Sequence, residues 1–212
     1  MLKKFFLDII YPIKCLGCKK SNIWLCEDCF NKIKISEKRC ESASFLNGLI
    51  IATDYEDELV RKIISKFKYS FIQELKESLG KLLIKKFKQL DNLNFDYIIP
   101  IPLFKRRELW RGFNQAELLA QEVSKEFSIP VLNNLVVRNK HTSQQVGQKK
   151  QKREENLKDA FKVNQEIRDM VRNKKILLVD DVFTTGITME EVAKELKDVD
   201  IKEVWGLVVA KG

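Results

Sequence analysis

The sequence LLVDDVFTTGIT, residues 177–188, carries the most information about this chain. Its apolar start predicts a buried strand ending in Asp180 and Asp181, and a polar turn then leads into a helical pattern near residues 189–197. Parallel α/β sheets hold their ligands beyond the carboxyl ends of the strands, where such turns lie. The segment therefore predicts an α/β fold and the position of its binding site.

Strand and helix patterns alternate along the rest of the chain. Apolar runs predict strands near residues 45–53, 96–102, 131–138, 174–181 and 204–210. Apolar residues at helical spacing predict helices near residues 59–67, 75–87, 115–127 and 189–197. Because most of these strands are apolar enough to be covered on both faces, we expect a mostly parallel, twisted sheet flanked by helices.

The cysteines near the start of the chain predict a metal site. They form two CxxC knuckles, Cys15 with Cys18 and Cys26 with Cys29, a spacing that gathers four thiolates around a structural Zn²⁺ ion. A redox pair and a finger that has lost its metal are the alternatives. Cys40 stands outside the pattern and is either a free cysteine or a substitute ligand.

This metal site divides the chain into two predicted domains. Residues 1–42 hold an N-terminal amphipathic helix and the zinc finger, where apolar residues are few and metal binding replaces a core. Residues 43–212 form the α/β domain. We expect no membrane span and a cytoplasmic location, because no apolar run is long enough and no export signal is recognisable. Attachment of the first helix to a membrane surface is the alternative.

The turn after the aspartates has the composition of an anion-binding loop. Thr184, Thr185 and Thr188 supply hydroxyls, Gly186 supplies backbone freedom, and the N-terminus of the next helix attracts negative charge. The motifs GxxxxGKS/T and GxGxxG are both absent from the sequence. A nucleoside-triphosphate or dinucleotide loop of those types is therefore excluded.

Two carboxylates beside a phosphate need a partner that offsets their charge. A divalent cation or the hydroxyls of a sugar can do so, and a ribose 5-phosphate offers a diol that can donate to Asp180 and Asp181. In this interpretation the aspartates bind the sugar and the threonine turn binds its phosphate. Alternatively, the aspartate pair only caps the following helix.

These motifs resemble those of a known family. Residues 179–188 resemble the 5-phosphoribosyl 1-pyrophosphate (PRPP) signature of type I phosphoribosyltransferases, and nearly the whole chain resembles the ComF family of competence proteins. This chain lacks the further cysteine pairs that many members carry after the second knuckle. Besides the knuckles, the family marks are Phe67-Lys68-Tyr69, Pro100-Ile101-Pro102-Leu103, Arg111-Gly112-Phe113-Asn114-Gln115, Thr142 with Gln145, and Arg153 with Asn156.

The resemblance implies a role for each of these motifs. Asp180 and Asp181 hold the ribose diol, with the cationic Arg107 and Arg111 beside them and Mg²⁺ bound with PRPP. For the arginines, a solvated basic start of a helix is the alternative. The implied pyrophosphate loop is Pro100, Ile101 and Pro102, and the implied phosphate-binding residues are Val182, Phe183, Thr184, Thr185, Gly186, Ile187 and Thr188. The implied hood loop over the site carries Thr142, Gln145, Arg153 and Asn156.

Two functions follow from the resemblance. The first is a phosphoribosyltransferase that binds PRPP and displaces its pyrophosphate with an acceptor that the sequence does not reveal. The second is a non-catalytic protein that handles single-stranded DNA in natural transformation, together with other proteins of a DNA-uptake machinery. A net charge of +9 and aromatic residues among cations, such as Phe104 and Trp110, favour the second function. The alternative for these aromatic residues is a place in the core or in an interface.

Overall fold

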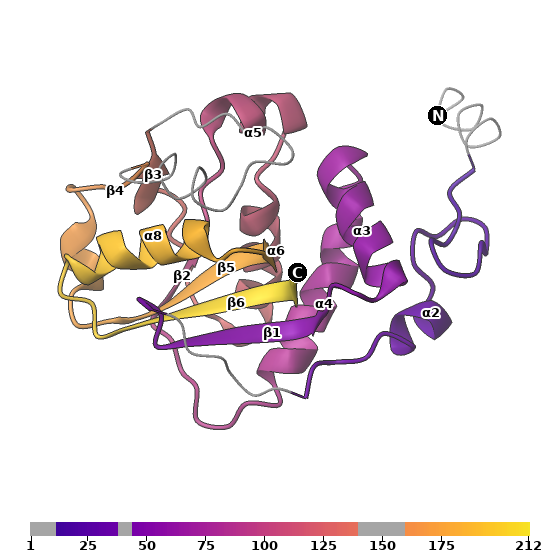
Figure 1. The fold of residues 1–212 in the computed structure, drawn as a ribbon, viewed down its shortest axis with the longest axis horizontal. Coiled ribbons are helices and arrows are strands. Elements are labelled where there is room, and N and C mark those ends of the chain that lie inside the picture. Colours follow the sequence, from indigo (N-terminus) through magenta and orange to yellow (C-terminus); the bar gives the residue numbers. More distant parts are fainter. Residues whose placement is uncertain (1–11, 38–43, 140–159) are drawn as a thin grey trace.

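The computed structural model describes residues 12–37, 44–139 and 160–212 (Figure 1). A four-stranded sheet lies at its centre, and neighbouring strands in this sheet are all parallel. The predicted α/β class with a mostly parallel sheet is thereby confirmed. In spatial order the strands are β1 (Gly48–Asp54), β6 (Glu203–Lys211), β5 (Lys175–Phe183) and β2 (Tyr97–Pro100).

Helices and a small second sheet surround this sheet (Figure 1). The described helices are α2 (Glu27–Asn31), α3 (Glu58–Tyr69), α4 (Leu75–Phe87), α5 (Lys105–Arg111), α6 (Gln115–Phe127), the 3-10 helix η1 (Arg168–Val171) and α8 (Ile187–Lys197). The second sheet is the antiparallel pair β3 (Val136–Arg138) and β4 (Phe161–Val163). None of the described helices is both long and apolar enough to cross a membrane.

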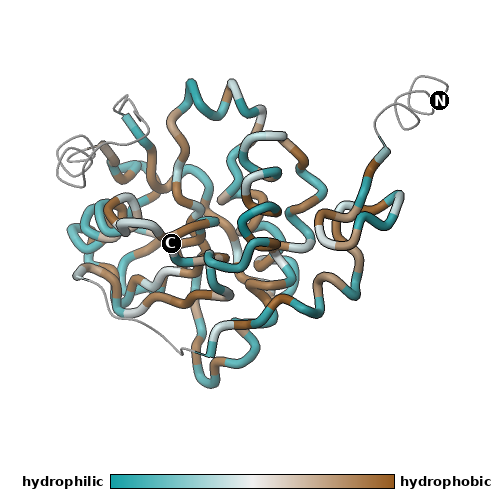
Figure 2. Tube along the Cα trace, turned by 45° about the vertical axis from the view of Figure 1, so that its right-hand side comes forward, coloured by the Kyte–Doolittle hydropathy of each residue, from teal (hydrophilic) through white to brown (hydrophobic). Residues whose placement is uncertain are grey.

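The central strands are apolar on both faces because both faces are covered. In β5, Leu177 and Val179 pack into one core cluster with α3, α4 and α6, whereas Ile176 and Leu178 pack into another with α8, β3 and β4. Apolar residues accordingly run along the strands in Figure 2. Each such buried aliphatic side chain stabilises the fold by about 1.5–3 kcal/mol, which explains why the strand patterns were readable in the sequence.

The chain changes sides of the sheet between two neighbouring strands. After β2 it continues through α5 into α6, which packs in the first core cluster, and after β5 it continues into α8, which packs in the second. The chain thus leaves the carboxyl ends of β2 and β5 toward opposite faces of the sheet. Since these two strands are neighbours, a crevice lies between their ends. The segment at residues 177–188 ends in this crevice.

The predicted strand at residues 131–138 is wrong as a single element. Val131 makes only an isolated parallel bridge to Ile98 on the outer edge of β2, and the chain then turns at Asn133 and Asn134 before β3 begins. Asparagine favours turns because its side chain bonds nearby polar groups, and Asn133 donates to the Glu117 carboxylate at 2.8 Å. The apolar run is thus divided between the edge of the central sheet and the second sheet.

The finger shares the main core, contrary to the expectation that metal binding replaces a missing one. Leu25 and Ile33 are buried in the same core cluster as the residues of α3 and α4. The exit segment is bonded to β1, since Ser36 N–H donates to the Ala52 carbonyl at 2.9 Å and the Thr53 hydroxyl donates to that of Lys34 at 2.8 Å. The predicted N-terminal helix, the boundary after residue 42 and Cys40 lie outside the described residues.

Candidate functional site

A cavity of about 360 Å³ lies at the carboxyl edge of the sheet, between the ends of β2 and β5. Its walls come from α3, the turn after β2, α5, β3 and the turn after β5. Hollows of about 600 and 510 Å³ lie beside the finger and under its exit segment, and neither contains adjacent aspartates or threonines next to a helix start. The crevice cavity is therefore the candidate site.

The threonine turn forms one end of this cavity. Thr184 and Thr188 line it, and a hollow of about 40 Å³ continues from it along Thr185 and Gly186. Gly186 has φ +77° and precedes the first turn of α8, and an added Cβ would lie 2.3 Å from the Phe183 ring. Only glycine fits there, and the turn leaves the N-terminus of α8 open toward an anion.

The two aspartates lie beside this turn in different environments. Asp181 is 2% exposed, and one of its oxygens accepts an ion pair from Lys68 Nζ at 2.9 Å. Its other oxygen, Oδ2, is buried and has no hydrogen-bond partner among the described residues. Asp180 Oδ1 accepts the backbone N–H of Asp181 at 2.8 Å. The pair thus presents carboxylate oxygens that are not used within the fold.

Burial and charge shift the titration of this cluster. Burial, together with the neighbouring Asp181 carboxylate, raises the pKa of Asp180 to about 7. Burial alone would lower the pKa of Lys68, but the carboxylates of Asp181 and Asp180 raise it above its usual value. Lys68 therefore stays protonated at neutral pH and forms the ion pair with Asp181.

Arginines supply further positive charge to the cavity. Arg111 is 7% exposed at the end of α5, donates to the side-chain oxygen of Gln115, and keeps its charge although burial lowers its pKa. Arg138 of β3 lies 5.4 Å from the centre of the Phe161 ring. Burial and the nearby Arg107 lower the pKa of Arg138 to about 10, so it also remains charged at neutral pH. With Lys68, four cations surround one cavity.

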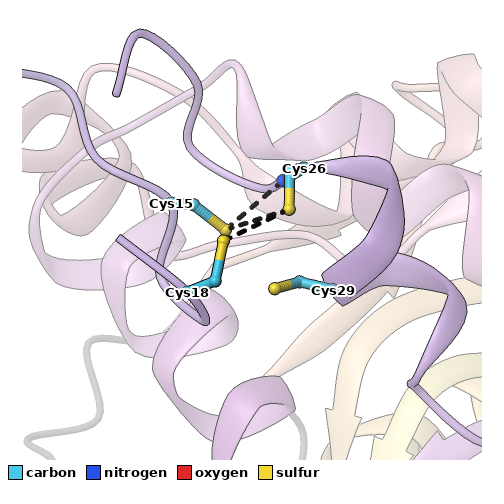
Figure 3. A group of neighbouring side chains, drawn as sticks. All are labelled: Cys15, Cys18, Cys26 and Cys29. Atoms are coloured by element: carbon cyan, nitrogen blue, oxygen red, sulfur yellow. Dashed lines mark hydrogen bonds between the residues drawn. The ribbon is translucent and has the colours of Figure 1, made fainter. Parts of the chain in front are cut away.

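The four cysteine sulfur atoms form a second candidate site (Figure 3). All lie within 4.8 Å of one another, with Cys15 and Cys26 Sγ 3.7 Å apart and Cys18 and Cys26 Sγ 3.5 Å apart. Sulfur atoms bound tetrahedrally at 2.3 Å from a zinc ion would be about 3.8 Å apart. The arrangement of Cys15, Cys18, Cys26 and Cys29 therefore fits a tetrahedral metal ion such as zinc.

Backbone groups of the knuckles favour a thiolate at Cys15. Burial by itself would raise the pKa of this thiol, but N–H groups of Cys26, Cys18 and Gly17 lower it to about 6. The N–H of Cys26 donates to Cys15 Sγ at 3.4 Å. Thiolates are the form of cysteine that binds metals, so the backbone geometry suits ligation.

Comparison with known proteins identifies the family. A model of the phosphoribosyl transferase domain matches residues 71–211, and competence protein F of Haemophilus influenzae is 33% identical over 92% of this chain and 90% of its own length. The chain belongs to the ComF family of phosphoribosyltransferase-fold proteins. DNA utilization protein YhgH of Escherichia coli K12 is 32% identical over 70% of this chain, and competence protein ComFC of Bacillus subtilis is 26% identical over 80%. Each of these two matches spans 65% of the relative's length.

The structure brings together most of the residues that the ComF resemblance implied. Pro100 ends β2, and Ile187 is buried against the second core cluster, so these two support the site without lining the cavity. Thr142, Gln145, Arg153 and Asn156 lie outside the described residues. The predicted residues that line the cavity are Ile101, Pro102, Arg107, Arg111, Asp180, Asp181, Val182, Thr184 and Thr188, and those that line the adjoining hollow also include Phe183, Thr185 and Gly186.

Sequence reasoning missed two cations of the crevice cavity. Lys68 was noted only as part of a family mark, and Arg138 only as the end of a predicted strand. The one signal for Lys68 was its position directly after the last apolar residue of the α3 stripe. The one signal for Arg138 was its position before a long polar stretch of sequence. The arginines at 107 and 111 lie on a helix, α5, but they are directed into the cavity rather than simply solvated.

Replacing Gly17 with alanine is expected to weaken metal binding about 10- to 100-fold, as changes next to metal ligands commonly do. An added Cβ would lie 2.6 Å from Cys29 Sγ, so the knuckle must open to accommodate it. Zn²⁺ transfer to a chromogenic chelator measures the affinity. Lys32→Ala, at an exposed residue of the same finger that adjoins no cysteine, is the matched control. Equal affinities of the two variants would contradict the prediction.

Proposed function

We propose that this chain binds PRPP in the crevice cavity and acts in the handling of incoming DNA. The observation that carries the proposal is that one cavity unites a glycine-threonine turn at a helix start, two adjacent aspartates and four cations. An anion-binding turn beside carboxylates is unfavourable for a simple phosphate. It suits a ligand that combines a phosphate, a diol and a second anionic group, as PRPP does.

Each part of PRPP finds a matching group in the proposed complex. The 5′-phosphate takes the threonine turn and the N-terminus of α8. The ribose diol donates to Asp180 and to the unpartnered Oδ2 of Asp181. The pyrophosphate binds to the turn at Ile101 and to the cavity arginines, whose guanidinium groups match phosphate oxygens.

The residues also fit a Mg²⁺ ion bound with PRPP. Mg²⁺ prefers oxygen ligands and is commonly held by one or two carboxylates plus substrate phosphates, and Asp180 and Asp181 supply such oxygens. When bound, the ion would stabilise negative charge on the pyrophosphate. For the four cysteines we propose structural zinc, kept as a thiolate complex in a reducing cytoplasm.

The implied reaction is displacement of pyrophosphate from C1 of the ribose. The bond from C1 to the pyrophosphate oxygen breaks, pyrophosphate leaves with the bonding electrons, and an acceptor nucleophile bonds to C1. Arg107, Arg111 and Arg138 offset the negative charge of the leaving group, and the aspartates offset positive charge on the ribose ring. The acceptor is not specified by the residues of the cavity.

Calorimetric titration with PRPP tests the proposal. We expect Mg²⁺-dependent binding by the intact protein, and a loss of affinity of about 10- to 150-fold in Asp181→Asn, because hydrogen bonds to charged groups contribute about 1.5–3 kcal/mol. Asp198→Asn, at an exposed position after α8, is the matched control and should bind normally. Failure of the intact, metal-loaded protein to bind PRPP would sink the proposal.

Binding of single-stranded DNA is a second candidate function, favoured by an aromatic surface at the mouth of the cavity. Tyr69 and Trp110 are each 64% exposed, and the Trp110 ring meets Phe71 edge-on at 5.0 Å. Lys105 and Arg106 are exposed on the same helix as Trp110. Aromatic side chains among cations suit base stacking along a nucleic-acid backbone. The names of the relatives, competence and DNA utilization proteins, agree with such a role, in which other DNA-uptake proteins would be partners.

Removing the Trp110 ring is expected to weaken DNA binding by about 5- to 150-fold, since stacking contributes about 1–3 kcal/mol per base. Fluorescence anisotropy of a labelled oligothymidine, repeated at several salt concentrations, measures the affinity of Trp110→Ala. The control is Leu109→Ala, which removes a neighbouring side chain that is 76% exposed and cannot stack. If both variants bind like the parent protein, the aromatic surface has no role in binding DNA.

A further inference from the structure

Helix α3 joins the four-cysteine site to the crevice cavity. Its first residues lie against the knuckles, and its last two, Lys68 and Tyr69, line the cavity. In Figure 1, α3 stands between α2 of the finger and the body of the α/β domain. The same helix therefore touches both candidate sites.

The start of α3 lies next to the knuckles at Gly17. Cys15, Cys26 and Cys29 belong to the same buried cluster as Val60 and Ile63 of α3. A Cβ added at Gly17 would lie 2.6 Å from Cys29 Sγ and 3.6 Å from a methyl group of Leu59. At Gly17 the knuckle backbone is thus packed between a metal ligand and the start of α3, whereas a hollow of about 600 Å³ separates Leu16 and Lys19 from the outer face of the helix.

Helix α3 is suited to move as a rigid unit, so that a shift of its first residues also shifts its last residues. The Asp57 carboxylate caps it by accepting the N–H groups of Leu59 and Val60 at 2.8 and 3.2 Å. No glycine or proline interrupts its 12 residues, which span about 18 Å at 1.5 Å per residue. At the far end, Phe67 packs against Phe113 at 5.5 Å, and the next residue is Lys68.

The finger depends on its metal more than the rest of the domain does. Among the described residues of the finger the one helix, α2, has five residues, too few to be stable alone, and the Cys18 ligand is exposed. Without a metal, four thiol groups within 4.8 Å lose the bonds that hold the knuckles together. The start of α3, where a methyl group of Leu59 lies next to Gly17, then loses a fixed neighbour.

We infer that the four-cysteine metal site positions Lys68, so that metal binding and PRPP binding are coupled through α3. Lys68 is the positioning residue in this coupling, because its ammonium group lies 2.9 Å from Asp181 Oδ1 and orients that carboxylate. The inference rests on the proposed function, because it describes the affinity for PRPP. Coupling between two sites in a protein is typically about 5- to 150-fold.

Calorimetry of PRPP binding to metal-loaded and chelator-stripped protein tests the coupling. We expect affinity to fall by about 5- to 150-fold on stripping. Equal affinities of the two forms would overturn the inference and leave the PRPP site intact. Absence of binding even to the loaded protein would remove the proposed function itself, and the coupling with it.

The reciprocal measurement avoids any need for a stable metal-free protein. Thermodynamic linkage requires PRPP to tighten metal binding by the same factor by which the metal tightens PRPP binding. We therefore expect PRPP to reduce the equilibrium transfer of Zn²⁺ from the loaded protein to a chromogenic chelator. Transfer that is unchanged by saturating PRPP would overturn the inference.

Lys68→Met distinguishes coupling through α3 from general stabilisation. If PRPP protected the metal only by stabilising the whole fold, the protection would persist in this variant at equal PRPP occupancy. Coupling through Lys68 predicts that it disappears. Lys66→Met, which removes an exposed lysine of the same helix, is the matched control and should keep the full effect. Protection retained in Lys68→Met would overturn the assignment of Lys68.

Discussion

Replacing Lys68 with methionine is expected to lower the free energy of unfolding by about 3 kcal/mol, which is the lower end of the cost of breaking a buried ion pair. The substitution leaves Asp181 buried at 2% exposure, with Oδ2 already lacking a partner and the other oxygen losing its ammonium group. Lys68 keeps some contact with solvent, its side chain being 21% exposed, and this favours the lower value. Urea denaturation at pH 7 measures the change.

A double-mutant cycle separates the interaction energy of the Lys68–Asp181 pair from the effects of each single substitution. Asp181→Asn removes the charge that Lys68 neutralises, so adding Lys68→Met to it should cost much less than Lys68→Met alone. Lys66→Met, on the solvent side of α3, should be nearly neutral. If Lys68→Met costs no more than Lys66→Met, then the ion pair does not hold the site together.

The pH dependence of this contribution follows from the raised pKa of Lys68. A lysine whose pKa is higher in the folded protein than in the unfolded chain stabilises the fold fully below the unfolded pKa of 10.5. The contribution is lost as pH rises through the folded pKa. Lys68 itself therefore keeps its full contribution from neutral pH to about pH 9. Lys68 also lowers the pKa of Asp180, so the stability lost in Lys68→Met should grow as the pH rises above about 7.

The elements of this fold were predictable where one periodicity governs a segment. The strands and helices around residues 174–197 and 115–127 were readable because both faces of the sheet are covered and the helices carry clear apolar stripes. The threonine turn was readable because its residue types have one shared chemical use. At residues 131–138 the same reasoning failed, because asparagines divide a single apolar run between two sheets.

Other parts of the site depend on contacts between distant segments. Lys68 and Asp181 are 113 positions apart in the numbering, and nothing local to either residue indicates that they pair at 2.9 Å. Arg138 lies near Arg107 only because β3 and α5 line the same cavity. The burial of the cysteines against α3 was equally hidden, since the finger on its own lacks a core. Partners of this kind are set by topology rather than by local pattern.

The charges of the cavity are unfavourable for stability, which agrees with the proposed binding of PRPP. Asp180 and Asp181 lie side by side at the end of a buried strand, with one lysine paired to them and one carboxylate oxygen unsatisfied. Sites that bind highly charged ligands commonly retain such unfavourable features, and substitutions that relieve them stabilise the fold while weakening function. This trade-off can be measured at Asp180.

Replacing Asp180 with asparagine is expected to stabilise the protein above pH 7 and to flatten its stability between pH 4 and 7. Burial raises the pKa of Asp180 from 3.8 to about 7, so in this window the native state binds more protons than the unfolded chain does. The free energy of unfolding of the parent protein therefore falls as pH rises, by a total of about 4 kcal/mol at 1.36 kcal/mol per pKa unit. Asparagine does not titrate and removes this loss.

Urea denaturation of Asp180→Asn and the parent protein from pH 4 to pH 8 measures both slopes. The exposed Asp198→Asn is the control and should keep the parent slope. Parallel curves for Asp180→Asn and the parent would show that Asp180 is not the titrating group. If the variant is more stable at pH 8 and binds PRPP more weakly, then an ionised Asp180 destabilises the protein when the cavity holds no ligand. Binding of PRPP would then offset that cost by supplying the diol that the carboxylate lacks.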